Sequence, residues 1–180
     1  MNTKTKKITA AGALLAICIV SQLFKNFSVY ITGPIINACL IIAVLTCGIF
    51  WAAVLAIITP VTAFLITGAP VMKAVPAIMP LVMLGNLVIV FMVWAFARKS
   101  KKHLNVLIGG IVGSVAKAAV MALTISYGVL SVVTLPEPMQ AKLPVLRATY
   151  SVTQLITALI GIAYALVIWA ALKKAFDTAD

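Results

Sequence analysis

Residues 26–72 form a run of 47 residues without one charged side chain. As a single α-helix this run would be about 70 Å long, whereas the hydrocarbon core of a bilayer is roughly 30 Å thick. The run therefore has to contain two helices that each cross a membrane.

The composition indicates the same class of protein. Of the 180 residues, 64% are hydrophobic and 9% are charged, far from the average of a soluble domain. Nearly every charge lies in a short cluster between apolar stretches. Helices are the expected form, because lipid satisfies no open sheet edge and the runs are too long for barrel strands. The sequence predicts an all-α integral membrane protein.

Six membrane helices are predicted within one membrane domain, residues 1–180. Gly33-Pro34 is expected to open the second span, and Gly48–Trp51 to form the turn before the third. Pro60 should bend or break the third span. The predicted spans are residues 8–24, 35–50, 52–67, 77–97, 104–130 and 148–172.

The distribution of basic residues predicts the orientation of the bundle. With both termini in the cytoplasm, nine basic residues lie inside and four lie outside, at Lys25, Lys73, Lys142 and Arg147. The positive-inside rule therefore favours cytoplasmic termini. A basic rim beside anionic lipid accounts for the net charge of +11, so the lipid bilayer is the expected partner and no nucleic acid is expected.

Lys117 lies near the middle of the apolar stretch 104–135, and the three acids of the chain lie outside its apolar segments. An ammonium at bilayer depth costs about 2.5 to 3.5 kcal/mol on insertion scales, so such residues usually face a cavity and serve a function. Without a carboxylate, Lys117 has to bind water, backbone carbonyls or the anionic or carbonyl oxygens of a ligand, or lose its proton. We interpret it as a ligand-binding residue.

Other polar side chains fall in the outer half of the predicted bundle. At a rise of 1.5 Å per residue, Asn37 lies about one turn below the outer end of its span, and Asn86 and Gln154 lie about 13 Å and 9 Å below theirs. Hydroxyl residues lie on the same faces as Gln154 and Lys117. The alternative is that these groups only join neighbouring helices. The candidate ligand-binding residues are Lys117, Asn86, Asn37, Gln154, Tyr150, Thr124 and Thr157.

Motifs for catalysis and for energy coupling are absent from the sequence. It has no G-x-x-x-x-G-K-[ST] phosphate loop, and no acid or histidine within its predicted spans. One histidine and three distant acids cannot form a metalloenzyme site, and Cys18, Cys39 and Cys47 match no metal or redox spacing. We therefore expect no enzymatic activity, no metal and no cofactor, while sodium coupling through backbone carbonyls stays open. Energy for active transport would come from another subunit.

Small residues that let helices approach closely occur in two predicted spans. Gly12 and Ala16 lie four residues apart in the first span, with Ala13 beside them, and Gly109 and Gly113 repeat the spacing in the fifth. The first set is a candidate partner interface. The spacing alone, however, favours packing within the chain.

Over nearly its whole length, the chain resembles the substrate-binding S components of energy-coupling factor (ECF) transporters. The resemblance rests on its length, its six predicted spans, the basic loop before the fifth, and a lysine-led first helix that continues as Thr9-Ala10-Ala11-Gly12-Ala13-Leu14-Leu15-Ala16. Shorter matches look like the group that includes riboflavin and other vitamin binders. They are Gly33-Pro34 with Asn37-Ala38, Leu84-Gly85-Asn86 and Lys117-Ala118.

The resemblance implies a protein of the bacterial plasma membrane that binds a vitamin or related micronutrient from outside. Such proteins associate with a membrane scaffold subunit and two ATPase subunits, and are thought to topple in the membrane to release the ligand inside. The AxxxA contact of the family maps onto Gly12 and Ala16, with glycine replacing the first alanine. Family pockets lie in the outer half of the membrane.

Two other kinds of function stay open from the residues alone. One is a self-contained secondary transporter or small channel, and the other is a membrane enzyme or assembly factor. The ligand also stays open. An ammonium beside amides suits pantothenate-, niacin- or folate-like carboxylates, and it also suits the carbonyls of a flavin.

Overall fold

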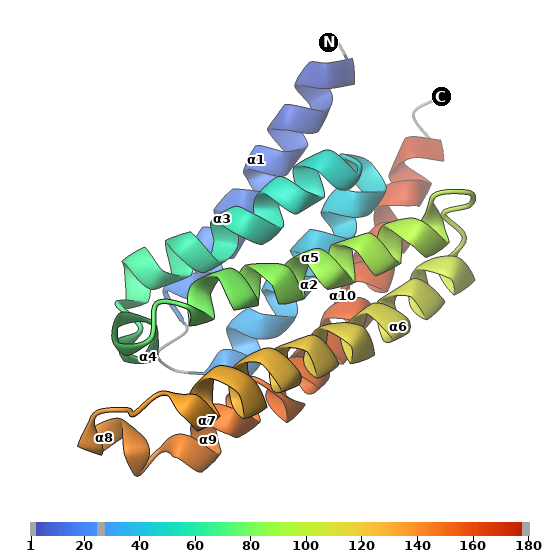
Figure 1. Cartoon of the computed structure of the whole chain (residues 1–180). Coiled ribbons are helices and arrows are strands. Elements are labelled where there is room, and N and C mark those ends of the chain that lie inside the picture. The colour runs from blue at the N-terminus through green and yellow to red at the C-terminus, as the bar shows by residue number, and fades with distance from the viewer. Residues whose placement is uncertain (1–2, 25–27, 178–180) are drawn as a thin grey trace.

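The computed structural model describes residues 3–24 and 28–177, and every regular element in these residues is a helix (Figure 1). In chain order the helices are α1 (Thr3–Gln22), α2 (Val29–Thr46), α3 (Ile49–Thr67), α4 (Pro70–Ala74), α5 (Ile78–Ala97), α6 (His103–Met121), the π-helix η1 (Ala122–Val129), α7 (Leu130–Val132), α8 (Glu137–Gln140), α9 (Leu143–Thr149) and α10 (Val152–Asp177). We call the end of the bundle with residues 98–102 and the start of α1 the terminal end. The opposite end, with α4, α8 and α9, is the loop end (Figure 1).

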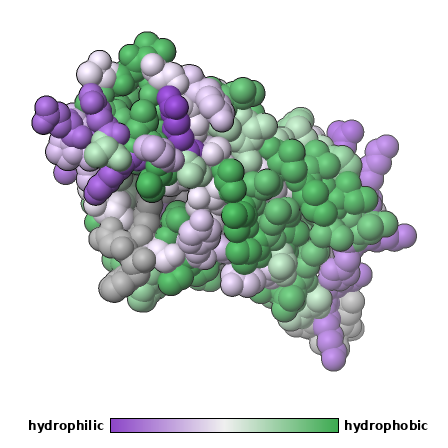
Figure 2. Space-filling view, turned by 90° about the horizontal axis from the view of Figure 1, so that it is seen from below, coloured by the Kyte–Doolittle hydropathy of each residue, from purple (hydrophilic) through white to green (hydrophobic). Residues whose placement is uncertain are grey.

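Five segments of the described chain are long and apolar enough to cross a membrane. On the face shown in Figure 2, apolar residues form a broad band between hydrophilic residues at the two ends. Such a band suits hydrocarbon, which offers no hydrogen bonds to polar groups. The five segments are Val29–Thr46, Ile49–Thr67, Ile78–Ala97, His103–Val132 and Leu143–Lys174. The predicted all-α, multi-pass membrane class is confirmed. Helix α1 is not one of the five segments, so the span predicted at residues 8–24 stays a prediction.

Helix α2 begins earlier than the sequence predicted. It starts at Val29, where the Ser28 side chain accepts a hydrogen bond from the backbone N–H of Tyr30 at 3.1 Å, so Pro34 lies inside the helix and not in its first turn. The capping serine satisfies one of the free N–H groups that every helix start exposes, which moves the start upstream of the proline. At its other end α2 stops at Thr46. Gly48, with φ +90°, then makes a tighter turn than the predicted residues 48–51.

Two of the later predicted spans are subdivided. The span predicted at 104–130 changes from α-helix to π-helix at Ala122. The span predicted at 148–172 is interrupted at residues 150–151, between α9 and α10. There the Ser151 hydroxyl donates to the carbonyl of Arg147 at 2.6 Å, a local bond that competes with the regular helical ladder. In the third span the break considered at Pro60 does not occur, since α3 continues from Ile49 to Thr67 with this proline inside it.

Helix α2 is the central element, packed against α1, α3, α5 and α10. Glycines allow helices to approach closely. A Cβ atom at Gly161 of α10 would lie 2.7 Å from the Asn37 Cβ and 2.9 Å from the Pro34 carbonyl of α2. A Cβ atom at Gly109 or Gly113 of α6 would lie 2.9 Å or 3.1 Å from side chains of α5, so in this helix the small residues serve packing within the chain.

The buried apolar residues form two clusters, and a polar layer lies between them. The larger cluster includes Leu40, Ile89 and Val106, and the smaller one, nearer the loop end, includes Ile78 and Met121. On α5 and α6 the change from one cluster to the other passes through Asn86 and Lys117, and on α2 Asn37 directly precedes the larger cluster. The fold thus brings three polar residues from three helices to the same depth.

Candidate functional site

Lys117 is the centre of the polar layer. Its side chain is 3% exposed, and its Nζ donates to Asn37 Oδ1 at 2.7 Å and to Asn86 Oδ1 at 2.9 Å. Asn37 and Asn86 are themselves buried. Because an ammonium only donates, amide oxygens are the atoms that it requires from these two residues. Helices α2, α5 and α6 are therefore joined at one charged group.

The backbone fixes which atom each amide presents to Lys117. Asn37 Nδ2 donates to the carbonyl of Gly33 at 2.9 Å, and Asn86 Nδ2 donates to the carbonyl of Ala56 at 3.3 Å. Ala56 is four residues before Pro60, which has no N–H, so its carbonyl lacks the usual helical donor. The Asn86 amide takes the place of that missing donor. Each asparagine thus has its nitrogen on a carbonyl and its oxygen on the ammonium.

We expect Pro60→Ala to loosen Asn86 while leaving Asn37 in place. The new N–H at residue 60 would bond to the Ala56 carbonyl and compete with Asn86 Nδ2, a hydrogen bond worth about 1 kcal/mol. In ¹⁵N-labelled protein, the side-chain amide resonance of Asn86 should move and that of Asn37 should not. Pro34→Ala is the matched control, because among the described residues no side chain bonds to the carbonyl of Tyr30, which that proline leaves free. An unmoved Asn86 resonance in Pro60→Ala would contradict the arrangement.

A cavity of about 100 Å³ opens beside the polar layer. Lys117, Asn37 and Asn86 contribute to one part of its wall, and Gln154 of α10 contributes to another. The rest of the wall is mainly aliphatic. The lining residues are Val29, Thr32, Gly33, Ile36, Asn37, Thr59, Pro60, Ala63, Met72, Val82, Asn86, Lys117 and Gln154.

Thr59 is a site residue that the sequence reasoning missed. It is 1% exposed, it lines the cavity, and its hydroxyl has no hydrogen-bond partner in the described part of the chain. Its carbonyl accepts a bond from Gln22 Nε2 of α1 at 3.0 Å, and Gln22 is fully buried. A hydroxyl residue directly before a proline in an apolar span was the available signal. The contact with Gln22 ties α1 to the wall of the cavity.

The structure brings four of the seven predicted site residues together and leaves three outside the cavity wall. Gln154 lines the cavity, with its Nε2 donating to the Thr149 carbonyl at 3.0 Å. Tyr150 instead packs in the apolar cluster near the loop end. Thr124 lies in η1, and its hydroxyl donates to the Val120 carbonyl at 2.7 Å. It lies outside the cavity wall because the wider π-turn changes which residues share the face of Lys117.

Thr157 is the third predicted residue outside the cavity wall. Its hydroxyl donates to the Thr153 carbonyl at 2.8 Å within α10. A Cβ atom on Gly33 of α2 would lie 2.8 Å from both the Cβ and the methyl group of Thr157. Thr157 therefore packs α10 against α2, and its hydroxyl proton is bonded within α10.

The three small residues proposed as a partner interface lie on an open face of α1. Gly12, Ala13 and Ala16 are all exposed, and no atom of the described residues lies within 4 Å of where a Cβ on Gly12 would be. By contrast, the thiols of Cys18, Cys39 and Cys47 are free and buried, as small apolar residues would be. Lys25, one of the four predicted external cations, lies outside the described residues.

Comparison of the chain with protein-family models, with curated proteins and with solved structures finds no match.

Proposed function

We propose that this protein is the substrate-binding S component of an ATP-driven importer of the energy-coupling factor type. It would bind a vitamin or related micronutrient at the bacterial cell surface and deliver it with partner subunits. One observation supports the proposal most. It is the buried ammonium of Lys117, held by two amide oxygens in the wall of a cavity inside a membrane bundle.

The chemistry of the cavity supports binding and not bond breaking. Its polar groups are an ammonium, amides and hydroxyls, which hold a ligand by hydrogen bonds. Among the described residues that line it there is no carboxylate, imidazole or thiol to act as a nucleophile or general base. Within the described chain there is also no group of acid, histidine and cysteine residues suited to a metal. We therefore propose that the protein is not an enzyme.

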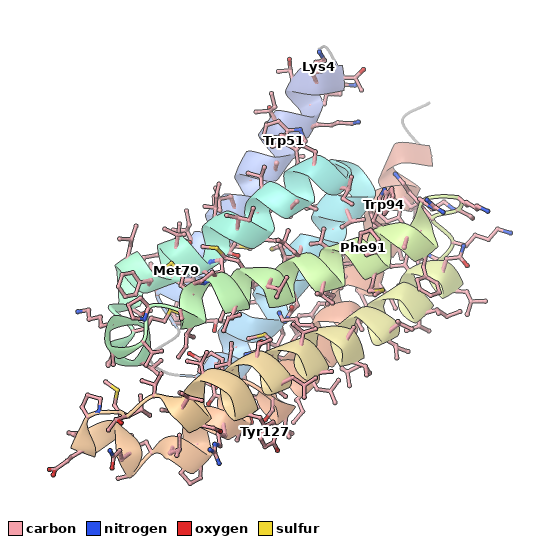
Figure 3. All side chains as sticks on the ribbon, viewed as in Figure 1. Lys4, Trp51, Met79, Phe91, Trp94 and Tyr127 are labelled. Carbon is pink, nitrogen blue, oxygen red and sulfur yellow. The ribbon has the colours of Figure 1, made fainter. Side chains whose placement is uncertain are left out.

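The proposed orientation has six spans and both termini in the cytoplasm. Basic residues support it, because Lys4 lies at the terminal end, beyond Trp51 and Trp94 (Figure 3). The Arg98 guanidinium lies 5.3 Å from the centre of the Trp94 ring. Tryptophan is enriched at both membrane interfaces, whereas lysine and arginine are enriched on the cytoplasmic side, so the basic residues favour a cytoplasmic terminal end. Helix α1 would cross the membrane in addition to the other five spans, and it packs against α2 and α3.

In this orientation the loop end faces outside, and α4, α8 and α9 form its cover. The lining includes Val29 near the start of α2 and Met72 of α4, so the cavity lies toward that end. A ligand would enter from outside past the loop end. The open face of α1 would bind the membrane scaffold subunit, and two ATPase subunits would supply the energy.

Reconstitution into liposomes tests this function. We expect the protein with the scaffold and ATPase subunits of its own organism to accumulate the ligand only when ATP is supplied. The protein alone should bind ligand without accumulating it. ATP-independent accumulation by the isolated chain would show a self-contained carrier and contradict the proposal, and so would chemical turnover of the ligand.

We expect the double variant Gly12→Leu and Ala16→Leu to bind ligand normally and to lose uptake. Both side chains would extend from the open face of α1, where close approach of another helix needs small residues. Uptake should fall by at least about tenfold, the effect of losing roughly 1.4 kcal/mol of subunit affinity. The matched control is Ala163→Leu with Ala170→Leu, two exposed alanines of α10. Equal uptake in both double variants would remove α1 as the interface.

A further inference from the structure

Among the described residues, no counter-charge lies beside the Lys117 ammonium. Its two hydrogen-bond acceptors are neutral amide oxygens. The acids in the described chain are Glu137 on the exposed helix α8 and Asp177 at the end of α10, both outside the polar layer. A buried charge without a counter-charge is costly in a low-dielectric interior. A carbonyl ligand would add a third neutral acceptor, whereas an anion would neutralise the site.

The cavity also offers two hydrogen-bond donors that the described protein leaves unused. An ammonium has three N–H groups, and Asn37 and Asn86 accept from two of them. The buried Thr59 hydroxyl has no hydrogen-bond partner among the described residues. Lys117 and Thr59 belong to the same cavity wall. A carboxylate has two oxygens and can accept from both donors, and charge-assisted bonds of this kind are roughly twice as strong as neutral ones.

The size and lining of the cavity limit the rest of the ligand. Its volume of about 100 Å³ is below the roughly 300 to 1,000 Å³ that is usual for sites of larger ligands. No aromatic ring stands among the described residues that line it, so the wall provides no stacking surface for a fused ring system. Ile36, Ala63 and Val82 provide an aliphatic surface instead.

We infer that the ligand is a compact aliphatic monocarboxylate. Its carboxylate binds the Lys117 ammonium and the Thr59 hydroxyl, and its apolar body lies against the aliphatic wall. This inference rests on the proposed function, because it names the chemistry of the ligand of that same site. It favours a carboxylate over a flavin carbonyl for Lys117. It also adds Thr59 as a specificity residue.

Thermal unfolding of the purified full-length protein in detergent provides the test. Cys18, Cys39 and Cys47 are buried and free, so a thiol-reactive fluorophore reports their exposure on unfolding. The probes are isovalerate and butyrate, each paired with its neutral amide, isovaleramide and butyramide, and inorganic phosphate. Millimolar carboxylate should raise the unfolding temperature, because a ligand that binds only the folded state stabilises it. The apparent affinity for each carboxylate should exceed that for its amide by at least about tenfold.

Two variants assign the effect to the site. Lys117→Met should lose the response to carboxylates, and Thr59→Val, which keeps the shape of the side chain, should weaken it by about three- to tenfold through the loss of one hydrogen bond. Equal stabilisation by carboxylate and amide would overturn the inference. It would also be overturned by an undiminished response in Lys117→Met, by phosphate acting as strongly as isovalerate, or by no response to any carboxylate. ATP-dependent uptake of a neutral ligand would sink this inference alone, and Lys117-dependent carboxylate binding with ATP-independent transport would sink the proposed function alone.

Discussion

Replacing Lys117 with methionine is expected to abolish ligand binding. The change removes the only buried cation of the described residues and keeps a side chain of similar length. Loss of a charge-assisted hydrogen bond of about 3 kcal/mol lowers affinity by roughly 100-fold. Native mass spectrometry of the protein purified from its own organism measures this directly, because the wild type should carry its ligand and the variant should not.

The same change should also destabilise the fold, for a separable reason. Without the ammonium, Asn37 Oδ1 and Asn86 Oδ1 lose the donor that each bonds at 2.7 Å and 2.9 Å, and a buried acceptor without a partner costs about 1 to 3 kcal/mol. The triple variant Lys117→Met, Asn37→Leu, Asn86→Leu removes the whole polar group. We expect it to recover the thermal stability that the single variant loses, but not the ligand.

Lys101→Met is the matched control for Lys117→Met. Lys101 is also a hydrogen-bonded lysine, but its Nζ donates to the Leu45 carbonyl at 2.6 Å, at the C-terminal end of α2 and away from the cavity. It should keep its ligand. If Lys117→Met co-purifies with as much of the same compound as Lys101→Met does, Lys117 does not bind the ligand.

The second large effect is expected from Gly161→Ala. The added methyl group would lie 2.7 Å from the Asn37 Cβ, 2.9 Å from the Pro34 carbonyl oxygen and 3.2 Å from the Ala38 nitrogen. Two of these atoms are backbone and cannot rotate away, so α10 has to move from α2. Overpacking of this kind costs about 1 to 3 kcal/mol, and the shift should also pull Asn37 from Lys117. We expect a lower unfolding temperature and about tenfold weaker ligand binding.

Two other glycines calibrate this experiment. Gly12→Ala meets no atom within 4 Å, and alanine is the better helix former, so the change should leave stability the same or slightly higher. Gly85→Ala would meet the Cγ and Sδ of Met121 at 2.7 Å, and such a flexible side chain can move. The expected loss of stability is therefore largest for Gly161, smaller for Gly85 and absent for Gly12. A Gly161→Ala protein as stable as Gly12→Ala would show that α10 and α2 are not packed as described.

Predictions from the sequence were most reliable where the presence or absence of charged residues alone determines the environment of a segment. An uncharged run such as residues 26–72 has few stable environments other than a bilayer, and a lysine within an apolar span requires partners wherever the helices lie. Helix boundaries were less certain, because competing signals lie only a few residues apart. Helix α2 starts after Ser28, and not at Pro34, because the Ser28 side chain caps the helix with one hydrogen bond.

Which of the candidate residues lie together in the site could not be predicted from the sequence. Depth along a span can be counted at 1.5 Å per residue, but the direction of a side chain depends on helix rotation. Thr124 shares a face with Lys117 only in a continuous α-helix, and the π-helix η1 breaks that register. Thr59 and Gln22 were missed for a different reason. Their importance comes from contacts between α1, α3 and the cavity, which no spacing within one helix reveals.

The sequence by itself determined that this chain is an all-helical membrane protein with one lysine, and no carboxylate, in its apolar spans. Both properties follow from the local cost of placing polar groups in hydrocarbon, which each segment carries without reference to the others. Only the tertiary structure decided that Asn37 and Asn86 bind Lys117 through their oxygens, because that orientation needs the carbonyls of Gly33 and Ala56 in place. It also decided that Thr59 stands with a free hydroxyl in the same cavity, since such a cavity exists only where several helices meet.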